Sequence, residues 1–393
     1  MNSDSRQAWA AAFAGCLALI TAMGIGRFVY TPILPFMIED AGITTAQAGL
    51  IASANFLGYL LGALAAAAIS LPGGRRRWLI NALAASAIST GAMGLVSGFG
   101  AFIALRFAGG VASAFVLILA STLVLDQLAT LRRGGLSAVH FGGVGAGIAL
   151  SAVLVAALAA RGHDSPDQWI ASGIVSLAAA GAVAWLSPRE RTPSAAAAPG
   201  VAGKVDPMLP RLTLAYGLFG FGYIITATFI SAMVRGAPDL RDAEPVVWLA
   251  VGLAGIPSVA AWGWVGRRTG EERAFAIACL VEAAGVVLSV LASNAAAVVL
   301  AAAMLGGTFI GISALGLVAA RRLASGDPRR ALAVMTAAFG LGQVIGPSFA
   351  GFAYDFGDSF LVPSLTAALA LVVAAGLVSA PRFRHGRGRR HPE

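Results

Sequence analysis

The sequence contains 393 residues, of which 58% are hydrophobic and 11% are charged, and its formal net charge is +9. A soluble globular protein carries roughly 25% charged residues, so these charges are too few to cover a soluble surface of this size. Apolar stretches of about twenty residues recur along the chain, and each is long enough to cross a bilayer core of ~30 Å. The composition therefore excludes a soluble protein. The basic residues lie in short loops between the apolar stretches, which also argues against a nucleic-acid-binding protein.

Twelve apolar spans are predicted along the chain. They are expected at residues 8–37, 45–70, 78–97, 101–127, 136–160, 168–187, 211–233, 245–266, 274–292, 295–320, 331–354 and 361–380. The non-apolar segment 188–210 is rich in proline, small residues and charges, which is typical of a flexible linker. We therefore expect an all-α polytopic membrane protein with a six-helix bundle at 1–187, a cytoplasmic linker at 188–210, a second six-helix bundle at 211–380, and a basic cytoplasmic tail at 381–393.

The basic residues predict the orientation of these spans. If the N-terminus is cytoplasmic, 22 of the 27 Lys and Arg residues fall in cytoplasmic segments, and only Arg161, Arg235 and Arg241 fall on the other side. An excess of Lys and Arg marks the cytoplasmic loops of membrane proteins. We therefore expect both termini in the cytoplasm and the protein in a bacterial inner membrane, with the lipid bilayer as its surroundings.

The two halves of the sequence resemble each other. TGEER at 269–273 stands 196 residues after GGRRR at 73–77, each in the loop after the second span of its half. At the same offset, the segment 23–27 in the first span lies opposite 219–223 in the seventh. A repeat of six spans in the same orientation indicates two bundles that rock about a central site.

Over nearly its whole length, the sequence resembles the major facilitator superfamily of transporters. GIGRFVYTPILPFM at 24–37 and HFGGVGAGIALS at 140–151 resemble the YbfB/YjiJ-type bacterial members. Arg106 and Gly110 are similar to the superfamily's R-x-x-x-G motif, and Gly342-Gln-Val-Ile-Gly346-Pro347 is similar to the G-x-x-x-G-P motif of its antiporters. The resemblance implies the superfamily's twelve-helix fold, a small-molecule substrate and transport by alternating access.

Two arginines inside the predicted spans are the leading candidates for substrate binding. Arg27 and Arg106 fall in the first and fourth spans, which line the cavity in the resembling fold. An arginine near the centre of a membrane helix costs ~2.5–3.5 kcal/mol on insertion scales, so it rarely faces lipid. Two guanidinium groups in one cleft would bind a carboxylate or phosphate in bidentate fashion. The alternative is that each arginine caps helix carbonyls or pairs within the bundle.

Four further residues are candidates for the substrate site. Asn55 and Tyr59 are four residues apart in the second span and share one helix face. Tyr30 and Tyr223 each offer an apolar ring with a polar tip. Packing in the helix core is the alternative role for all four.

His140, Glu282 and Arg106 are candidates for coupling transport to protons. Histidine titrates near neutral pH, Glu282 is a carboxylate in the middle of a span, and Arg106 could act by switching partners. The alternatives are a hydrogen-bonded packing role for His140 and a structural role for Glu282.

The sequence thus predicts a secondary transporter that moves a small solute, with an organic anion favoured by the arginines and a proton as the coupling ion. A drug or metabolite efflux antiporter is the alternative within this class. A membrane-embedded enzyme would need a catalytic constellation inside the spans, and none is apparent. Cys16 and Cys279 lie in different halves without metal-ligand spacing. We therefore expect no catalytic residues, no metal, no cofactor, no nucleic-acid partner, and a monomer.

Overall fold

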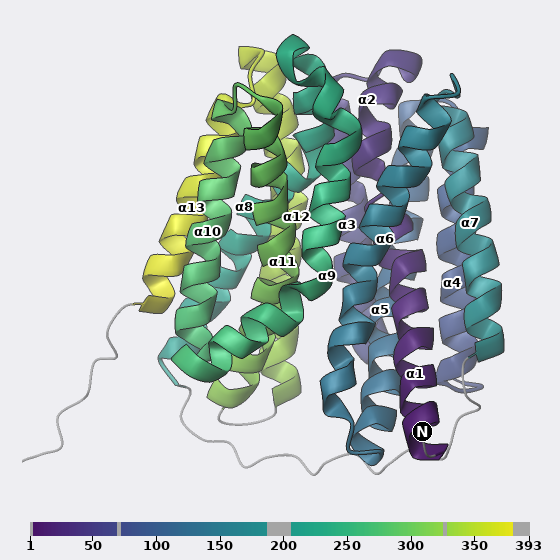
Figure 1. Cartoon of the computed structure of the whole chain (residues 1–393), viewed down its shortest axis with the longest axis vertical. Helices are drawn as coiled ribbons and strands as arrows, with labels where there is room; N and C mark the ends of the chain where they lie inside the picture. Colours follow the sequence, from purple (N-terminus) through teal and green to yellow (C-terminus); the bar gives the residue numbers. More distant parts are fainter. Residues whose placement is uncertain (1–2, 69–71, 187–205, 325–327, 380–393) are drawn as a thin grey trace, which may run out of the picture.

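The computed structural model describes residues 3–68, 72–186, 206–324 and 328–379, which form helices joined by short connections (Figure 1). Twelve helical segments in these ranges are long and apolar enough to cross a membrane, which confirms the predicted number of spans. Residues 188–205 of the predicted linker and the predicted tail 381–393 lie outside the described ranges. The first helix of the second half begins at Met208, three residues before the predicted start of its bundle.

The first half (residues 3–186) contains the first six spans. Its elements are α1 Ser3–Leu19, η1 Ile20–Ile25, α2 Tyr30–Ala41, α3 Thr45–Ala68, α4 Arg75–Ala92, η2 Met93–Leu95, α5 Phe99–Thr130, η3 Gly134–Leu136, α6 Ser137–Ala159 and α7 Ser165–Leu186. One span of this half, the first, is built from three pieces: α1, η1 and α2.

The second half (residues 206–379) contains the other six spans. Its elements are α8 Met208–Gly236, η4 Pro238–Ala243, α9 Glu244–Thr269, α10 Glu271–Leu291, α11 Ala295–Leu323, α12 Pro328–Gly357 and α13 Leu361–Ser379. The first span of this half, α8, is one continuous helix of 29 residues.

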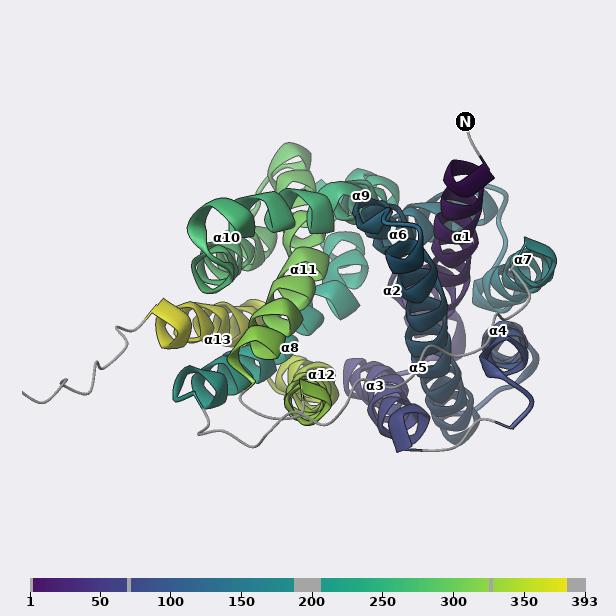
Figure 2. The same ribbon diagram turned by 90° about the horizontal axis from the view of Figure 1, so that it is seen from below.

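The two halves stand side by side with their helices roughly parallel to one axis (Figures 1 and 2). We call the end where α1 and α8 begin and α13 ends the terminal face. The opposite end, where α2 and α8 end and α9 begins, is the far face. Large apolar side chains remain exposed on the outside of the bundle, among them Trp185, Phe356 and Leu369. Exposed apolar side chains on the outer surface of a membrane protein contact lipid, as the composition predicts.

Most contacts between the halves are made by three helix pairs: α3 with α12, α6 with α9, and α2 with α8. Small residues let the backbones of these pairs approach closely. A Cβ atom on Gly49 of α3 would lie 2.2 Å from the carbonyl oxygen of Pro347 of α12, and one on Gly252 of α9 would lie 2.3 Å from the backbone nitrogen of Ala149 of α6. The glycine-rich segment of α6 is therefore a packing surface.

The repeat that the sequence indicates is visible in the backbone. Gly74 precedes α4 and Gly270 precedes α10, and both have φ 92°. These two residues are 196 positions apart, which is the offset between GGRRR and TGEER. The same backbone conformation with positive φ therefore precedes the third span of each half, at a position where glycine avoids the steric cost of a Cβ atom.

Candidate functional site

The first span contains a break at mid-length. The α-helix α1 gives way to the π-helix η1, and residues 26–29 form a turn before α2 begins. Glycine is a poor helix former, and Gly24 and Gly26 lie at this point. Gly24 also permits a close helix contact, since a Cβ atom there would lie 2.3 Å from the Cα atom of Gly147. Short π-helical segments often mark functional sites.

Arg106 of α5 caps this break. The side chain is buried, and its two terminal nitrogens donate to the carbonyl oxygens of Gly26 at 2.9 Å and Arg27 at 2.8 Å. The backbone nitrogen of Thr31 donates to Phe28 at 3.3 Å, so the carbonyl of Arg27 lacks its usual helical donor. The geometry is that of carbonyl capping, one of the two roles that the sequence left open for this arginine.

Tyr30 and Asn55 lie around Arg106. The Tyr30 hydroxyl donates to the carbonyl of Ala48 at 2.8 Å, and its ring centroid is 5.1 Å from the Arg106 guanidinium carbon. The Asn55 side-chain nitrogen donates to the Arg106 carbonyl at 2.8 Å. These two predicted residues therefore lie inside the first half, in contact with the group that caps the break.

Arg27 lies in the turn itself and reaches across to the second half. One terminal nitrogen donates to Oε1 of Gln343 on α12 at 2.9 Å, and the guanidinium carbon is 4.1 Å from the ring centroid of Tyr59 and 4.8 Å from that of Phe56. The side chain is only 3% exposed, and its Nε atom has no hydrogen-bond partner among the residues that the structure describes. Within the described residues, no carboxylate forms an ion pair with Arg27.

Tyr223 of α8 continues this chain of contacts. The Gln343 side-chain nitrogen donates to the Tyr223 hydroxyl oxygen. The Tyr223 ring is nearly parallel to two neighbours: Phe309 at 5.5 Å with an interplanar angle of 6°, and Phe339 at 5.8 Å and 5°. Arg27, Gln343 and Tyr223 thus link the two halves at the core of the protein, beside a stack of aromatic rings.

Glu282 of α10 is fully buried in the second half. Neither carboxyl oxygen has a hydrogen-bond partner of normal geometry in the described part of the chain. The Thr308 hydroxyl lies beside the carboxyl group, yet it donates to the carbonyls of Met304 and Leu305. Glu282 also interacts electrostatically with Tyr223, so it lies near the end of the chain that starts at Arg27.

His140 of α6 is also fully buried but lies elsewhere, among helices of the first half. Its Nε2 atom is 3.0 Å from the Ser121 hydroxyl oxygen. Its Nδ1 atom packs against α1 so closely that a Cβ atom on Gly15 would lie 2.4 Å away. The structure therefore places His140 and Glu282 in different halves.

The G-x-x-x-G-P motif lies on the packed face of α12. A Cβ atom on Gly342 would lie 2.2 Å from the carbonyl oxygen of Gly217 on α8, and one on Gly346 would lie 2.7 Å from the Ile224 side chain. The motif keeps α12 close to α8. This contact holds Gln343, which follows Gly342 in the sequence, next to Tyr223.

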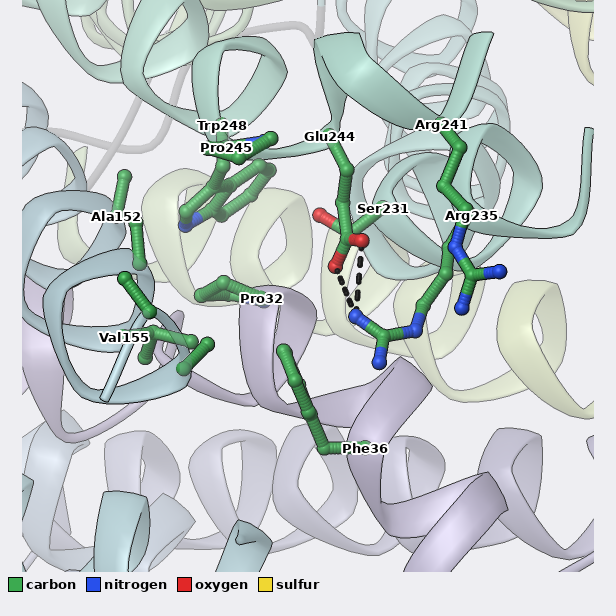
Figure 3. Close-up of a pocket in the computed structure, with 13 residues that line it drawn as sticks. Pro32, Phe36, Ala152, Val155, Ser231, Arg235, Arg241, Glu244, Pro245 and Trp248 are labelled. Atoms are coloured by element: carbon green, nitrogen blue, oxygen red, sulfur yellow. Dashed lines mark hydrogen bonds and ion pairs between the residues drawn. The ribbon is translucent and has the colours of Figure 1, made fainter. Parts of the chain in front are cut away.

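A cluster of charges joins the halves at the far face, and we call its members Glu39, Arg235 and Glu244 the Arg235 cluster. Two guanidinium nitrogens of Arg235 on α8 donate to the Glu39 carboxylate on α2 at 2.8 and 2.7 Å. A third nitrogen contacts the Glu244 carboxylate on α9 at 2.9 and 3.2 Å (Figure 3). The guanidinium also stacks on the Phe36 ring at 4.0 Å.

The Arg235 cluster was not among the predicted site residues. Its signal in the sequence was the charge asymmetry: Arg235 and Arg241 are two of three basic residues predicted on the side that the others avoid. Their partners could not be read from the sequence, because Glu39 and Arg235 are 196 residues apart.

A cavity of about 360 Å³ lies beside the Arg235 cluster, between the halves. Its walls come from α2 and α6 of the first half and from α8, η4 and α9 of the second (Figure 3). Among the side chains that line it are Phe36, Ser231, Arg241 and Trp248. Across the described ranges, no group of three or more His, Cys, Asp or Glu side chains is arranged to hold a metal ion.

Comparison with known proteins gives three further findings. A transporter of Bacillus subtilis (strain 168) described as the MFS-type transporter YceJ is 33% identical over 119 residues, which is 30% of each chain. A chloramphenicol resistance protein of Streptomyces lividans is 26% identical over 380 residues, covering 92% of this chain and 93% of the relative. The solved structure of the nucleoside transporter NupG matches with a TM-score of 0.76 at 13% identity, covering 94% of this chain and 98% of that one.

The family described as "Uncharacterised MFS-type transporter YbfB" matches residues 19–379, nearly the whole of both helical bundles. Together with the twelve spans and the fold shared with NupG, this match confirms the resemblance drawn from residues 24–37 and 140–151. The chain belongs to the YbfB-type family of major facilitator superfamily transporters and is a multi-pass membrane protein of that fold.

Proposed function

We propose that this transporter moves a small organic anion by alternating access and that its coupling ion is the proton. The observation that supports an anionic substrate is the environment of Arg27. A buried guanidinium is expensive unless an anion or strong acceptors surround it. Among the described residues, Arg27 has beside it one amide oxygen, the Tyr59 hydroxyl and aromatic rings, and its Nε atom has no hydrogen-bond partner. A carboxylate between the halves would supply the missing charge and accept from two nitrogens at once.

Alternating access requires contacts between the halves to break and form again. The Arg235 cluster joins α2 to α8, the Asp355 carboxylate accepts from the backbone nitrogen of Ala46 at 3.2 Å, and Ser53 donates to the Val344 carbonyl at 2.7 Å. These contacts lie between the centre of the protein and the far face. We infer that the structure is closed at the far face, and that breaking these contacts opens a path from that side to Arg27.

The far face is periplasmic in this proposal, and both termini are cytoplasmic in a bacterial inner membrane. The support is the excess of Lys and Arg in the segments at the terminal face. Reporter fusions at residue 200 and at the C-terminus test it, and both should report the cytoplasm. A periplasmic signal from either fusion would contradict the orientation.

The predicted site residues then take different roles. We assign Arg27, Tyr59 and Tyr223 to the substrate site, because they lie where the two halves meet. We assign Arg106, Tyr30 and Asn55 to supporting the broken first span. Arg106 donates to two carbonyls of that span, Asn55 donates to the Arg106 carbonyl, and Tyr30 of the span donates to the Ala48 carbonyl of α3.

Glu282 is the stronger candidate for proton coupling. A buried carboxylate without partners pays a large desolvation cost, so we infer that Glu282 carries its proton in this conformation. Loss of that proton would place a negative charge near Tyr223, at the end of the series of contacts that starts at Arg27, where it would disfavour a substrate anion. His140 has a hydroxyl partner within its own half. It is not part of the series of contacts that joins Arg27, Gln343 and Tyr223.

A drug efflux antiporter is the second candidate function. The chloramphenicol resistance protein favours it, since its likeness at 26% identity spans nearly the whole chain, and the G-x-x-x-G-P motif on α12 agrees with it. An efflux pump of this kind would accept chloramphenicol, which has no carboxylate. Transport of chloramphenicol by vesicles that ignore organic anions would favour this alternative.

Substitution of Arg27 tests the proposed function. Arg27→Ala should abolish solute transport in proteoliposomes while leaving membrane insertion intact, and Arg27→Lys should fail to restore it, because lysine lacks the planar pair of donors. Arg161, an exposed residue whose guanidinium contacts a carbonyl of its own helix, offers Arg161→Ala as a matched control. Wild-type transport by Arg27→Ala would remove the anion site from this position.

A further inference from the structure

The aromatic rings around Arg27 carry an inference about its substrate that rests on the proposed function. In the second half, Tyr223 stands parallel between Phe309 and Phe339, and all three rings belong to different helices. These three side chains are held in place by three helices and form a rigid aromatic cluster, which we call the Tyr223–Phe309–Phe339 stack. Such a stack favours an aromatic ring, because an aromatic ring gains from stacked or edge-to-face contacts that a saturated ring cannot make.

A ring from the first half already packs against this stack. Phe28, the residue after Arg27, has its centroid 6.0 Å from Phe309 in an edge-to-face arrangement and 6.5 Å from Trp248. Phe28 and Arg27 belong to the half that moves away from these partners when the halves separate. The structure therefore shows one aromatic ring seated against the second half directly beside the guanidinium.

The polar groups complete the chemistry of the position. The Arg27 guanidinium carbon is 5.5 Å from the Phe28 centroid, so a carboxylate attached to a ring at that place would lie within reach of the guanidinium. Its present acceptor is the neutral amide oxygen of Gln343, which a carboxylate would replace with a stronger, charged one. The Gln343 amide would then be free to donate to the substrate instead of to Tyr223.

We propose that the space between Arg27 and the Tyr223–Phe309–Phe339 stack binds a planar aromatic carboxylate, whose ring takes the place that Phe28 occupies here and whose carboxylate takes the place of the Gln343 oxygen. The site recognises two features separately. The flat ring is bound by the second half, and the charge is bound by the first half, so a solute with both features holds the halves together around itself.

Three small probes test the two features: benzoate has a flat ring and a charge, cyclohexanecarboxylate has the charge with a puckered ring, and benzyl alcohol has the ring without the charge. Equilibrium binding to the purified full chain should favour benzoate over each of the other two by about tenfold, because an aromatic contact and a charge-assisted pair each contribute on that scale. Trp248 fluorescence provides the signal, and loss of the signal change in Trp248→Phe identifies its source.

Two variants separate the features. Phe309→Leu should remove the preference for benzoate over cyclohexanecarboxylate and keep the preference over benzyl alcohol, whereas Arg27→Gln should do the reverse. Phe349→Leu is the matched control, since Phe349 pairs with Phe221 and makes no ring contact with the stack. Its binding should equal that of the unmodified protein.

The outcomes distinguish this inference from the proposed function. Equal binding of benzoate and cyclohexanecarboxylate, an equal loss of both in Phe309→Leu, or no binding of benzoate would overturn the inference. Transport of non-aromatic anions could still support the proposed function in that case. Benzoate that binds with the expected preferences but does not cross the membrane of proteoliposomes would support the inference and contradict the proposed function.

Discussion

Neutralising Glu39 should loosen the far face, because this carboxylate supplies the ion pair across the halves in the Arg235 cluster. Glu39→Gln keeps the size of the side chain and removes the charge that accepts from two Arg235 nitrogens at 2.7 and 2.8 Å. The Glu39 side chain is 48% exposed, so its pair with Arg235 belongs near the range of exposed ion pairs, about 1 kcal/mol. That difference changes the population of the opened state about fivefold.

Labelling of a cysteine in the closed interface measures this population. Ser231 lines the far-face cavity and is buried, so the thiol in Ser231→Cys should react mainly when the halves part. The background should carry Cys16→Ala and Cys279→Ala, and the protein should be in detergent so that both faces are open to the reagent. We expect Glu39→Gln to raise the labelling rate about fivefold at low salt, and 1 M salt should narrow the difference by screening the pair in the parent.

Glu244→Gln is the matched control for this experiment. Glu244 also contacts Arg235, but both residues belong to the second half and stay together when the halves separate. Its labelling rate should remain close to that of the parent. Equal acceleration by Glu244→Gln, or none by Glu39→Gln, would refute the assignment of Glu39 to the contact that closes the far face.

The remaining predictions concern the broken span and the coupling group. Arg106→Lys should destabilise the protein by about 1–3 kcal/mol, seen as a lower thermal unfolding midpoint, because the single nitrogen of lysine cannot reproduce the planar pair of nitrogens that donate to the two buried carbonyls. An unchanged midpoint would argue against capping. Gly24→Ala should destabilise the protein by about 1–3 kcal/mol through overpacking. Gly181→Ala, where a Cβ atom meets nothing within 4 Å, should be neutral or slightly stabilising. Similar losses of stability in both variants would contradict the close contact at Gly24. Glu282→Gln should keep solute exchange in vesicles but lose accumulation driven by a pH gradient, and retained accumulation would exclude Glu282 as the proton carrier.

The number and extent of the spans could be predicted from the sequence because a bilayer constrains both length and charge. An apolar helix must be about twenty residues long, and arginines at its ends mark where it stops. The break in the first span could not be predicted in the same way. The segment 20–29 stays apolar throughout apart from Thr21 and Arg27, so its hydropathy is the same whether it is an α-helix, a π-helix or a turn.

The sequence predicts which polar residues of the candidate site are buried, but not which residues they contact. Burial of Arg27 and Arg106 followed from their positions in apolar spans, and both are 3% exposed. Their different partners did not follow, because the carbonyls of residues 26 and 27 are free for Arg106 only when the helix breaks. Gln343 was missed for a related reason: an amide in a motif of packing glycines gives no charge signal, and its contact with Arg27 spans 316 residues.

Because its first span is broken, the first half of the protein should bend more easily than the second half. In the second half, the corresponding helix α8 runs unbroken for 29 residues from one face to the other. A displacement of Arg235 at the far face would therefore move the whole of α8. In the first half, α2 is connected to α1 through η1 and a four-residue turn, held in place by one guanidinium. A displacement of Glu39 would therefore tilt α2 about that turn before it moved α1. We expect the first span to bend mainly at residues 26–29 during the transport cycle. Arg27 belongs to this turn, so bending there would also move its guanidinium.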